Sequence, residues 1–418
     1  MIVVGVLLVF CALFGAPLFA IIAASAMWGY YRNDIDLSAI PIEVFGIAEM
    51  PVLLAIPLFT FAGYLLSESD APKRLVRLTT ALLGWVPGGL AIICLAACAF
   101  FTAFTGASGV TIIALGALLY PALKQSGYDE NFNLGLVTSS GSLGLLFAPS
   151  LPLILYGVVA AVSIDDLFVA GVLPGLLMLV MLSGWCLWIN RDRRTPMDQF
   201  SWQQVRAAVW EAKWEIPLPI VVLGGIYSGY FAVSEAAAVT ALYVLLIEVF
   251  VLREIPFTKL PKIMRESMVL VGGIFIILGV SLASTNYMID AEVPDKLFRF
   301  VDSYVSSQVT FLFLLIVFLL ILGAILDIFS ALVLVVPLIL PVAQGYDVNP
   351  VHLGIIFLAA MQLGYLTPPV GLNLFIASYR FDKSITQIYL ATLPFLLILL
   401  LSVVVITFWP SLSLIMLQ

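Results

Sequence analysis

The sequence predicts an all-α polytopic membrane protein built from two inverted repeats, each with a re-entrant helical hairpin and a proline-broken transmembrane helix. Three observations support this fold class. Apolar residues occupy 63% of the 418 positions and charged residues only 10%, whereas soluble globular chains contain about 25% charged residues. Apolar stretches long enough to cross a bilayer, about 20 residues each, recur along the chain. A series of glycines, prolines and polar segments also occurs twice, 220 positions apart.

The rare residue types exclude several classes of function. The net charge of −7 offers no surface for a polyanion, so nucleic acid is not an expected partner. Cys11, Cys94, Cys98 and Cys186 lie inside apolar runs, and the only histidine, His352, is far from them in the sequence. They are therefore expected to form neither a disulfide framework nor a tetrahedral metal site. The chain has no Walker motif for ATP hydrolysis, and it is not expected to be an enzyme.

The apolar stretches define the expected elements in order. The first runs from Ile2 to about Met27 without a basic segment before it, which indicates a retained membrane helix and not a cleaved signal. The stretches 88–120 and 309–340 are too long for one pass and carry glycine or polar residues midway, so each is predicted to be a hairpin. The complete set of stretches is 2–29, 40–66, 88–120, 131–161, 167–189, 216–232, 234–252, 267–286, 309–340, 352–380 and 385–410.

Two of these stretches, 131–161 and 352–380, carry breaks at mid-membrane. The breaks read Phe147-Ala148-Pro149-Ser150 and Thr367-Pro368-Pro369-Val370-Gly371. Proline removes a backbone donor and frees a carbonyl. Because lipid-facing backbone cannot tolerate unsatisfied polar groups, the breaks are predicted to line a cavity enclosed by protein.

The distribution of Lys and Arg predicts the orientation. With the N-terminus in the cytoplasm and two hairpins, 15 of the 18 basic residues face the cytoplasm, as the positive-inside rule requires. Only Arg32, Lys296 and Arg299 remain outside, where the loops are acidic. The basic segments at 73–77 and 191–213 are expected to be interfacial helices. The cytoplasmic loops in this arrangement are 67–87, 121–130, 190–215, 253–266 and 380–384.

The internal repeat is read from matching segments. GYDENFNLG at 127–135 matches GYDVNPVHLG at 345–354. The basic residues place the base of the first hairpin inside and that of the second outside, so the repeats are inverted. Paired interrupted helices in inverted repeats indicate a secondary transporter with its site near the midplane, although an old duplication kept for packing is the plainer alternative. The pairs at a constant offset of 220 are Pro121 and Pro341, Gly144 and Gly364, Pro149 and Pro369, and Pro174 and Pro394.

The hairpin tips hold the candidate ligands. The first turns at Thr105–Gly109 and the second near Gly323–Ser330. Opposed helix ends at such tips present carbonyls and hydroxyls that suit Na⁺. Asp327 is the only carboxylate within 309–340, and an intramembrane carboxylate is a functional candidate by default. Its structural alternative is a capping or interhelical hydrogen bond.

The tips and breaks together predict a sodium- and substrate-binding region, with Na⁺ as coupling ion and no other cofactor. The carbonyls near Gly364 and Tyr365 are expected to be free to face an ion. Arg380 follows the second broken helix and is a candidate contact for an anionic solute, with membrane anchoring as its alternative. The sodium and substrate candidates are Thr105, Gly106, Ala107, Ser108, Gly109, Thr138, Gly144, Phe147, Pro149, Ser150, Gly323, Asp327, Ser330, Gly364, Tyr365, Thr367, Pro368, Pro369, Val370, Gly371 and Asn373.

These segments resemble the large membrane subunit, the DctM or SiaM type, of tripartite ATP-independent periplasmic (TRAP) transporters. The chain has Thr105-Gly106-Ala107 where that family usually has Ser-Gly-Ser, and Ala148-Pro149 where it usually has two prolines. The matching segments span nearly the whole chain: Leu54–Phe59, Gly88–Ala91, the first tip, Ser163-Ile164, Leu167–Gly171, Pro174-Gly175, Ser234–Ala238 and Thr367–Gly371.

The resemblance implies an elevator-type, sodium-coupled importer of organic acids, typically carboxylates, in the bacterial inner membrane. It implies two partners, a periplasmic substrate-binding protein and a small four-helix membrane subunit, here expected as a separate chain because nothing precedes the first helix. The expected division is 1–87 for N-terminal scaffold helices, 88–189 for the first repeat, 190–266 for central scaffold helices and 267–418 for the second repeat and C-terminal helix.

Three alternatives remain open at this point. A stand-alone ion-coupled anion carrier of similar architecture would work without a binding protein. A channel would need a continuous polar pore, whereas the polar residues here gather at two tips and two breaks. An intramembrane protease would need a paired Ser/His or Asp/Asp site, and Asp327 has no evident partner.

Overall fold

A computed structural model describes residues 2–86, 88–191 and 200–417, and every regular element in these ranges is helical. Six helices are long and apolar enough to cross a membrane, and a seventh crossing results if one bent helix pair is counted as a single span. The predicted all-α membrane fold is therefore confirmed. The six are Pro51–Glu68, Ile164–Ile189, Val233–Val251, Leu260–Asp290, Ile328–Gly345 and Ile385–Phe408.

The N-terminal segment differs from its prediction as one helix over 2–29. It consists of α1 (Ile2–Leu13) and α2 (Leu18–Arg32). Gly15 between them adopts a left-handed backbone conformation with φ 83°, and Pro17 has no N–H to continue a helix. Neither piece alone has the length of a membrane span.

The predicted stretch 40–66 is also interrupted. It contains α3 (Ala39–Gly46), two 3₁₀ turns (Ile47–Glu49 and Pro51–Leu54) and α4 (Ala55–Glu68). Met50 between the turns has an extended backbone, as expected for a residue before proline. Only the part from Pro51 onward is a candidate span.

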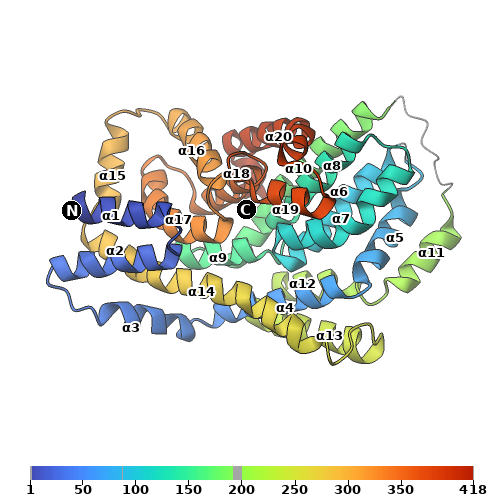
Figure 1. Cartoon of the computed structure of the whole chain (residues 1–418), viewed down its shortest axis with the longest axis horizontal. Helices are drawn as coiled ribbons and strands as arrows, with labels where there is room; N and C mark the ends of the chain where they lie inside the picture. Colours follow the sequence, from blue (N-terminus) through green and yellow to red (C-terminus); the bar gives the residue numbers. More distant parts are fainter. Residues whose placement is uncertain (1, 87, 192–199, 418) are drawn as a thin grey trace.

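One long helix organises a layer along the lower edge of Figure 1. This helix, α14 (Leu260–Asp290), packs against α2, α3 and α4. Next to α4 lies α13 (Val233–Leu245), which continues as a π-helical turn over Leu246–Val251. The predicted stretch 216–232 forms only the short helix α12 (Pro217–Tyr227).

The two predicted hairpins lie above this layer in Figure 1. The first consists of α6 (Gly89–Thr105) and α7 (Ser108–Gln125), and the second of α16 (Gln308–Gly323) and α17 (Ile328–Gly345). Each stretch therefore turns back midway, as its length predicted.

The two broken helices are interrupted over longer segments than predicted. The first consists of α8 (Glu130–Ser140), a 3₁₀ turn (Leu143–Leu146) and α9 (Leu151–Ala160), with a bend of 43°. The second consists of α18 (Pro350–Gly364) and α19 (Leu372–Phe381), separated by seven residues from Tyr365 to Gly371. Each break contains a cis X–Pro bond, before Pro149 and before Pro369.

The remaining helices complete the molecule. The spans α10 (Ile164–Ile189) and α20 (Ile385–Phe408) pack together, with α21 (Ser411–Leu414) beside α10. Shorter helices lie at the surface: α15 (Val293–Asp302), α5 (Ala71–Leu83) and α11 (Trp202–Glu211).

The interfacial segment predicted at 73–77 lies in α5, and residues 202–211 of the segment predicted at 191–213 form α11. These two helices contact each other at the right of Figure 1. Part of the second segment, 192–199, lies outside the described residues.

Candidate functional site

The tip of the first hairpin is enclosed by the rest of the chain. Gly106 adopts a left-handed conformation (φ 63°) and ends α6, and Ala107 is extended before α7 begins at Ser108. Thr105 and Ser108 are both buried. Helix α4 approaches so closely that a Cβ on Gly63 would lie 2.6 Å from Thr105 Cα.

A threonine outside the predicted set joins this hairpin to the first break. The Thr102 hydroxyl lies 2.7 Å from the Thr111 hydroxyl across the hairpin. It has two carbonyl acceptors for its one proton, Cys98 of its own helix at 2.7 Å and Gly141 at 2.9 Å. All four residues are buried. A polar residue one turn before the Thr105–Gly109 tip was the only signal in the sequence that could have singled out Thr102.

The first break packs directly on α6 through a glycine. A Cβ added at Gly144 would lie 2.3 Å from the Ala99 carbonyl oxygen and 2.5 Å from the Ala103 nitrogen, so only glycine fits there. Inside the break, Ser150 donates to the Leu145 carbonyl at 2.6 Å. Pro149 is buried beside it.

Two other candidates of the first repeat, Thr138 and Phe147, make contacts away from the hairpin tip. Thr138 donates to the Leu134 carbonyl of its own helix at 2.6 Å. The Phe147 ring lies against α10, where a Cβ on Gly175 would be 2.7 Å from it. Ser142, which the predicted set omits, is buried, and its hydroxyl oxygen has no hydrogen-bond partner among the described residues. Ser142 is therefore a better candidate ligand than Thr138.

The second break packs on the second hairpin in the equivalent way. A Cβ added at Gly364 would lie 2.4 Å from the Gly323 backbone. The amides of Val370 and Gly371 both point to the Ala324 carbonyl at the hairpin tip, at 3.1 and 3.4 Å. The tip and the break are thus in direct backbone contact.

Two carbonyls in this break were expected to be free, and this prediction is wrong. The Gly364 carbonyl accepts from the Thr367 amide at 3.0 Å, and the Tyr365 carbonyl accepts from the Asn373 amide at 3.2 Å. Backbone amides on either side of the two prolines, that of Thr367 before them and that of Asn373 after them, satisfy these acceptors. The Tyr365 hydroxyl in turn accepts from the Ile328 amide at 2.9 Å.

Asp327 serves as the N-cap of α17. Its carboxylate accepts from the amides of Phe329 and Ser330, each at 3.0 Å, and from the Ser330 hydroxyl. The capping alternative is therefore confirmed. Asp327 and the neighbouring Pro368 and Pro369 are exposed, so the second tip is open where the first is enclosed.

One contact connects the first hairpin to the second broken helix. The Ser108 hydroxyl donates to Asn373 Oδ1 at 2.7 Å, and both residues are buried. Asn373 Nδ2 has no hydrogen-bond partner among the described residues. The prediction paired each tip with the break of its own repeat and did not foresee this contact between repeats.

The same contact brings two helix N-termini together. Ser108 is the first residue of α7, and Asn373 is the second residue of α19. Gly109 adjoins Ile376 of α19, where an added Cβ would lie 2.6 Å from the isoleucine side chain. Helix N-termini carry partial positive charge and unpaired amides. With the free amide of Asn373, this meeting point suits an anion such as a carboxylate.

A cavity of about 690 Å³ lies beside this meeting point, between α4, α7, α14 and α19. Val110 of the first turn of α7 lines it, together with Arg265 and Arg380. Arg380 donates through Nε to the Ile113 carbonyl at 3.2 Å and is exposed. The cavity therefore leads from the first turn of α7 toward the ends of the helices that carry the basic loops.

Comparisons with known proteins give a consistent result. A family model described as the DctM component of the tripartite ATP-independent periplasmic transporter matches residues 3–412. The C4-dicarboxylate TRAP transporter large permease protein DctM of Pseudomonas aeruginosa is 33% identical over 91% of this chain and 89% of its own length. The ectoine/5-hydroxyectoine TRAP transporter large permease protein UehC of Ruegeria pomeroyi is 31% identical over 87% and 85%.

Among solved structures, the YdaH transporter of Alcanivorax borkumensis has a similar fold. The TM-score is 0.57 at 14% identity, with 89% of this chain and 87% of that chain covered. At this identity the likeness concerns the fold alone.

Proposed function

Because the chain belongs to the family of the DctM component of tripartite ATP-independent periplasmic transporters, we propose that it imports an organic acid by sodium-coupled secondary active transport. As a family member with six to seven apolar spans, it is a TRAP transporter large permease and a multi-pass protein of the inner membrane. The observation that carries the proposed substrate class is the buried, unpartnered amide of Asn373 beside Ser108.

The groups at the meeting point of the α7 and α19 N-termini favour binding of a carboxylate. The Asn373 amide offers two N–H donors, and the N-termini of α7 and α19 add a positive electrostatic potential. Half-helix N-termini directed at anionic substrate groups are a recurrent arrangement in secondary transporters. The name of one relative points the same way, since it describes a C4-dicarboxylate permease. Another relative is named for isethionate, which is a sulfonate and therefore also an organic anion. The exposed Arg380 is placed to meet the solute again on its way out through the 690 Å³ cavity.

For sodium we propose two sites, one at each pair of tip and break. The first lies between Thr105–Gly109 and the segment 141–150, where the Ser142 hydroxyl has no hydrogen-bond partner in the part of the chain that the structure describes. The second lies between the tip at Ala324–Asp327 and the break at Thr367–Gly371. Oxygen ligands suit a hard cation, and the Asp327 carboxylate adds negative charge near the second site.

The transport step we propose is an elevator movement of two inverted repeats. Gly144 packs on α6 and Gly364 packs on α16, and these glycines are equivalent at the 220-residue offset. In this proposal the moving body contains both hairpins and both broken helices, from 88–189 and 267–418. The scaffold comes mainly from 1–87 and 190–266, together with α14. A small four-helix membrane subunit and a periplasmic binding protein are the proposed partners.

Reconstitution of the purified chain with its small subunit in liposomes tests this function. Uptake of a carboxylate solute is expected only with an inward Na⁺ gradient and with the binding protein outside. A K⁺ gradient of equal size serves as the control. Uptake driven by K⁺ alone would exclude sodium coupling, and uptake without the binding protein would favour the stand-alone carrier.

Asp327→Asn separates charge from capping at the second tip. Asparagine caps helices about as well as aspartate, so the fold should be unchanged. Because a negative charge near a cation is removed, the Na⁺ concentration for half-maximal uptake is expected to rise about threefold to tenfold, which corresponds to about 1 kcal/mol. An unchanged sodium dependence would leave Asp327 with the capping role alone.

A further inference from the structure

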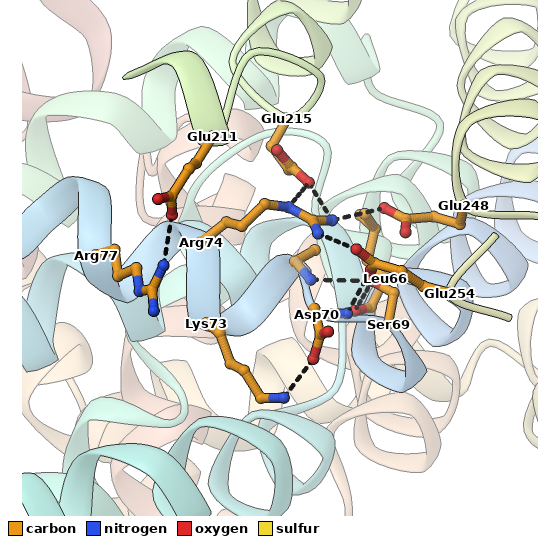
Figure 2. Close-up of polar contacts among 11 residues, drawn as sticks. Leu66, Ser69, Asp70, Lys73, Arg74, Arg77, Glu211, Glu215, Glu248 and Glu254 are labelled. Atoms are coloured by element: carbon orange, nitrogen blue, oxygen red, sulfur yellow. Dashed lines mark hydrogen bonds and ion pairs between the residues drawn. The ribbon is translucent and has the colours of Figure 1, made fainter. Parts of the chain in front are cut away.

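One buried arginine is surrounded by three glutamates from separate segments (Figure 2). Arg74 on α5 donates through Nε to Glu215 Oε1 at 2.6 Å, and its Nη2 lies 2.6 Å from the same oxygen. Its Nη1 pairs with Glu254, and its Nη2 lies 3.4 Å from Glu248 Oε1. These four residues are called the Arg74 cluster below. If all four were ionised, the cluster would carry three negative charges and one positive charge.

Three of the four side chains in the cluster are largely shielded from water, and Glu254 is the most exposed at 19%. The Arg74 side chain is 11% exposed, that of Glu215 3% and that of Glu248 2%. The second carboxyl oxygens of Glu215 and Glu248 are buried and have no hydrogen-bond partner among the described residues. A buried carboxylate without a partner is costly, and such a group takes up a proton instead.

The charged groups around the cluster do not supply a second cation to it. Lys73 pairs with Asp70, and Arg77 pairs with Glu211 at 2.8 Å. Lys259 pairs with Glu68 at 2.6 Å, and Lys213 stacks on the rings of Trp210 and Trp214. Arg253 precedes Glu254, and no ion pair joins it to the described residues of the cluster. The Tyr243 hydroxyl donates to the Trp214 carbonyl at 2.9 Å.

The geometry points to a proton as the missing partner. We propose that the Arg74 cluster binds one proton at neutral pH, carried by Glu248, and that loss of this proton to the cytoplasm loosens α5 from the scaffold. Glu248 makes the longest contact with Arg74 and has the most buried side chain of the four residues. Arginine keeps its own proton in proteins. Burial raises the pKa of the Glu215 carboxyl above its ordinary value, although the contact with Arg74 acts to lower it.

The backbone at Glu248 is also unusual. It belongs to the π-helical turn Leu246–Val251, and π-helical turns are frequent at functional sites. The Glu248 carbonyl accepts from the amides of Glu254 and Ile255, at 2.9 and 3.3 Å. The chain after α13 therefore turns back at its cytoplasmic end, and this turn places Glu248 and Glu254 on the guanidinium of Arg74.

The position of α5 gives the proton a mechanical consequence. This helix connects scaffold helix α4 to hairpin helix α6, and its first turn is tied to the same cluster because the Asp70 amide donates to Glu254 Oε2 at 2.7 Å. At its other end the chain passes through Gly84 and the left-handed Gly88 (φ 73°) into α6. The Arg74 cluster thus fixes the base of the first hairpin to the scaffold, whatever solute or ion is transported.

The attachment of α5 should weaken as the pH rises, because the Arg74 cluster binds a proton more tightly in the folded protein than in the unfolded chain. A carboxyl whose folded-state pKa is raised stabilises the fold while the proton is bound, and this contribution is lost as pH rises through the folded-state pKa. Above the folded-state pKa, each further pH unit lowers the equilibrium constant for the attachment of α5 about tenfold. Alkaline pH should therefore release α5.

The experiment compares the full-length protein in nanodiscs with Glu248→Gln and with Glu211→Gln as the matched control. Hydrogen–deuterium exchange of peptides covering 66–80 is measured between pH 6 and pH 9, after correction for the intrinsic pH dependence of exchange. We expect wild-type exchange to accelerate about tenfold over this range. Glu248→Gln should stay protected throughout, and Glu211→Gln should behave like the wild type.

A second measurement detects the protonated carboxyl group directly. The infrared carbonyl band of a protonated carboxyl group should be present in the wild type at pH 7 and absent in Glu248→Gln. Loss of protection in Glu248→Gln at pH 6, or failure of that variant to fold, would show that a neutral side chain at position 248 does not support the attachment of α5 and would overturn the proposal. Equal pH profiles for the wild type and Glu248→Gln would overturn it as well.

Discussion

Asn373→Asp is expected to abolish uptake while the protein still folds and inserts. Aspartate keeps the oxygen that accepts from the Ser108 hydroxyl at 2.7 Å, so the contact between the repeats is preserved. It replaces the unpartnered amide nitrogen by a negative charge that repels a carboxylate. Placing like charges together in a buried site costs several kcal/mol, so a loss of about 3 kcal/mol, or about 100-fold in uptake rate, is expected.

The control and the contrary outcome for this variant are both specific. Asn131→Asp makes the same chemical change on the exposed start of α8 and should leave uptake unchanged. If the meeting point of α7 and α19 binds sodium and not the solute anion, the added charge should lower the Na⁺ concentration for half-maximal uptake. Normal uptake with tighter sodium dependence in Asn373→Asp would therefore reassign this point to the cation.

Gly364→Ala is expected to give the second large effect. The added Cβ would lie 2.4 Å from backbone atoms of Gly323, which cannot rotate away as a side chain could. Overpacking of this kind costs about 1–3 kcal/mol. The break would be pushed away from the second hairpin tip, where the Val370 and Gly371 amides reach Ala324. Thermal stability should fall, and sodium-dependent uptake should be largely lost.

Gly184→Ala is the matched control for this change. Gly184 lies in α10, and an added Cβ there meets no atom within 4 Å, so alanine should be neutral or slightly stabilising, since it is the better helix former. The two variants are compared by thermal unfolding in detergent and by uptake in liposomes. A Gly364→Ala protein with the stability and uptake of Gly184→Ala would show that the hairpin can move aside and that close backbone contact is not required.

The sequence predicts those elements whose signals are local. The helices α10 and α20 are found within a few residues because each is one uninterrupted apolar run. The hairpins follow from length, since 88–120 and 309–340 exceed one bilayer crossing. The N-terminal helices are mispredicted because apolar length was given more weight than Gly15 and Pro17, which break the run.

The candidate site is predicted less completely because its decisive contacts are not local. The prolines locate both breaks, but the sequence could not show that the amides of Thr367 and Asn373 return to satisfy the carbonyls before them. Ser108 and Asn373 were both in the predicted set, yet they are 265 positions apart, and internal symmetry suggested different pairings. Nothing in the sequence distinguishes Ser142 from the other small polar residues on α8 and the turn after it.

The unequal lengths of two scaffold helices have a consequence for the surrounding bilayer. At 1.5 Å per residue, the 31 residues of α14 extend about 46 Å and the 11 residues of α12 about 16 Å, against a hydrocarbon thickness of about 30 Å. The apolar part of α14, residues 267–286, spans about 30 Å and matches the bilayer, so the charged first turns of this helix should extend past the interface. Where α12 faces lipid, we expect the bilayer to be thinned to match its shorter length. A thinned bilayer shortens the distance between the two aqueous phases, so lipid chain length becomes a determinant of how far a solute must be carried.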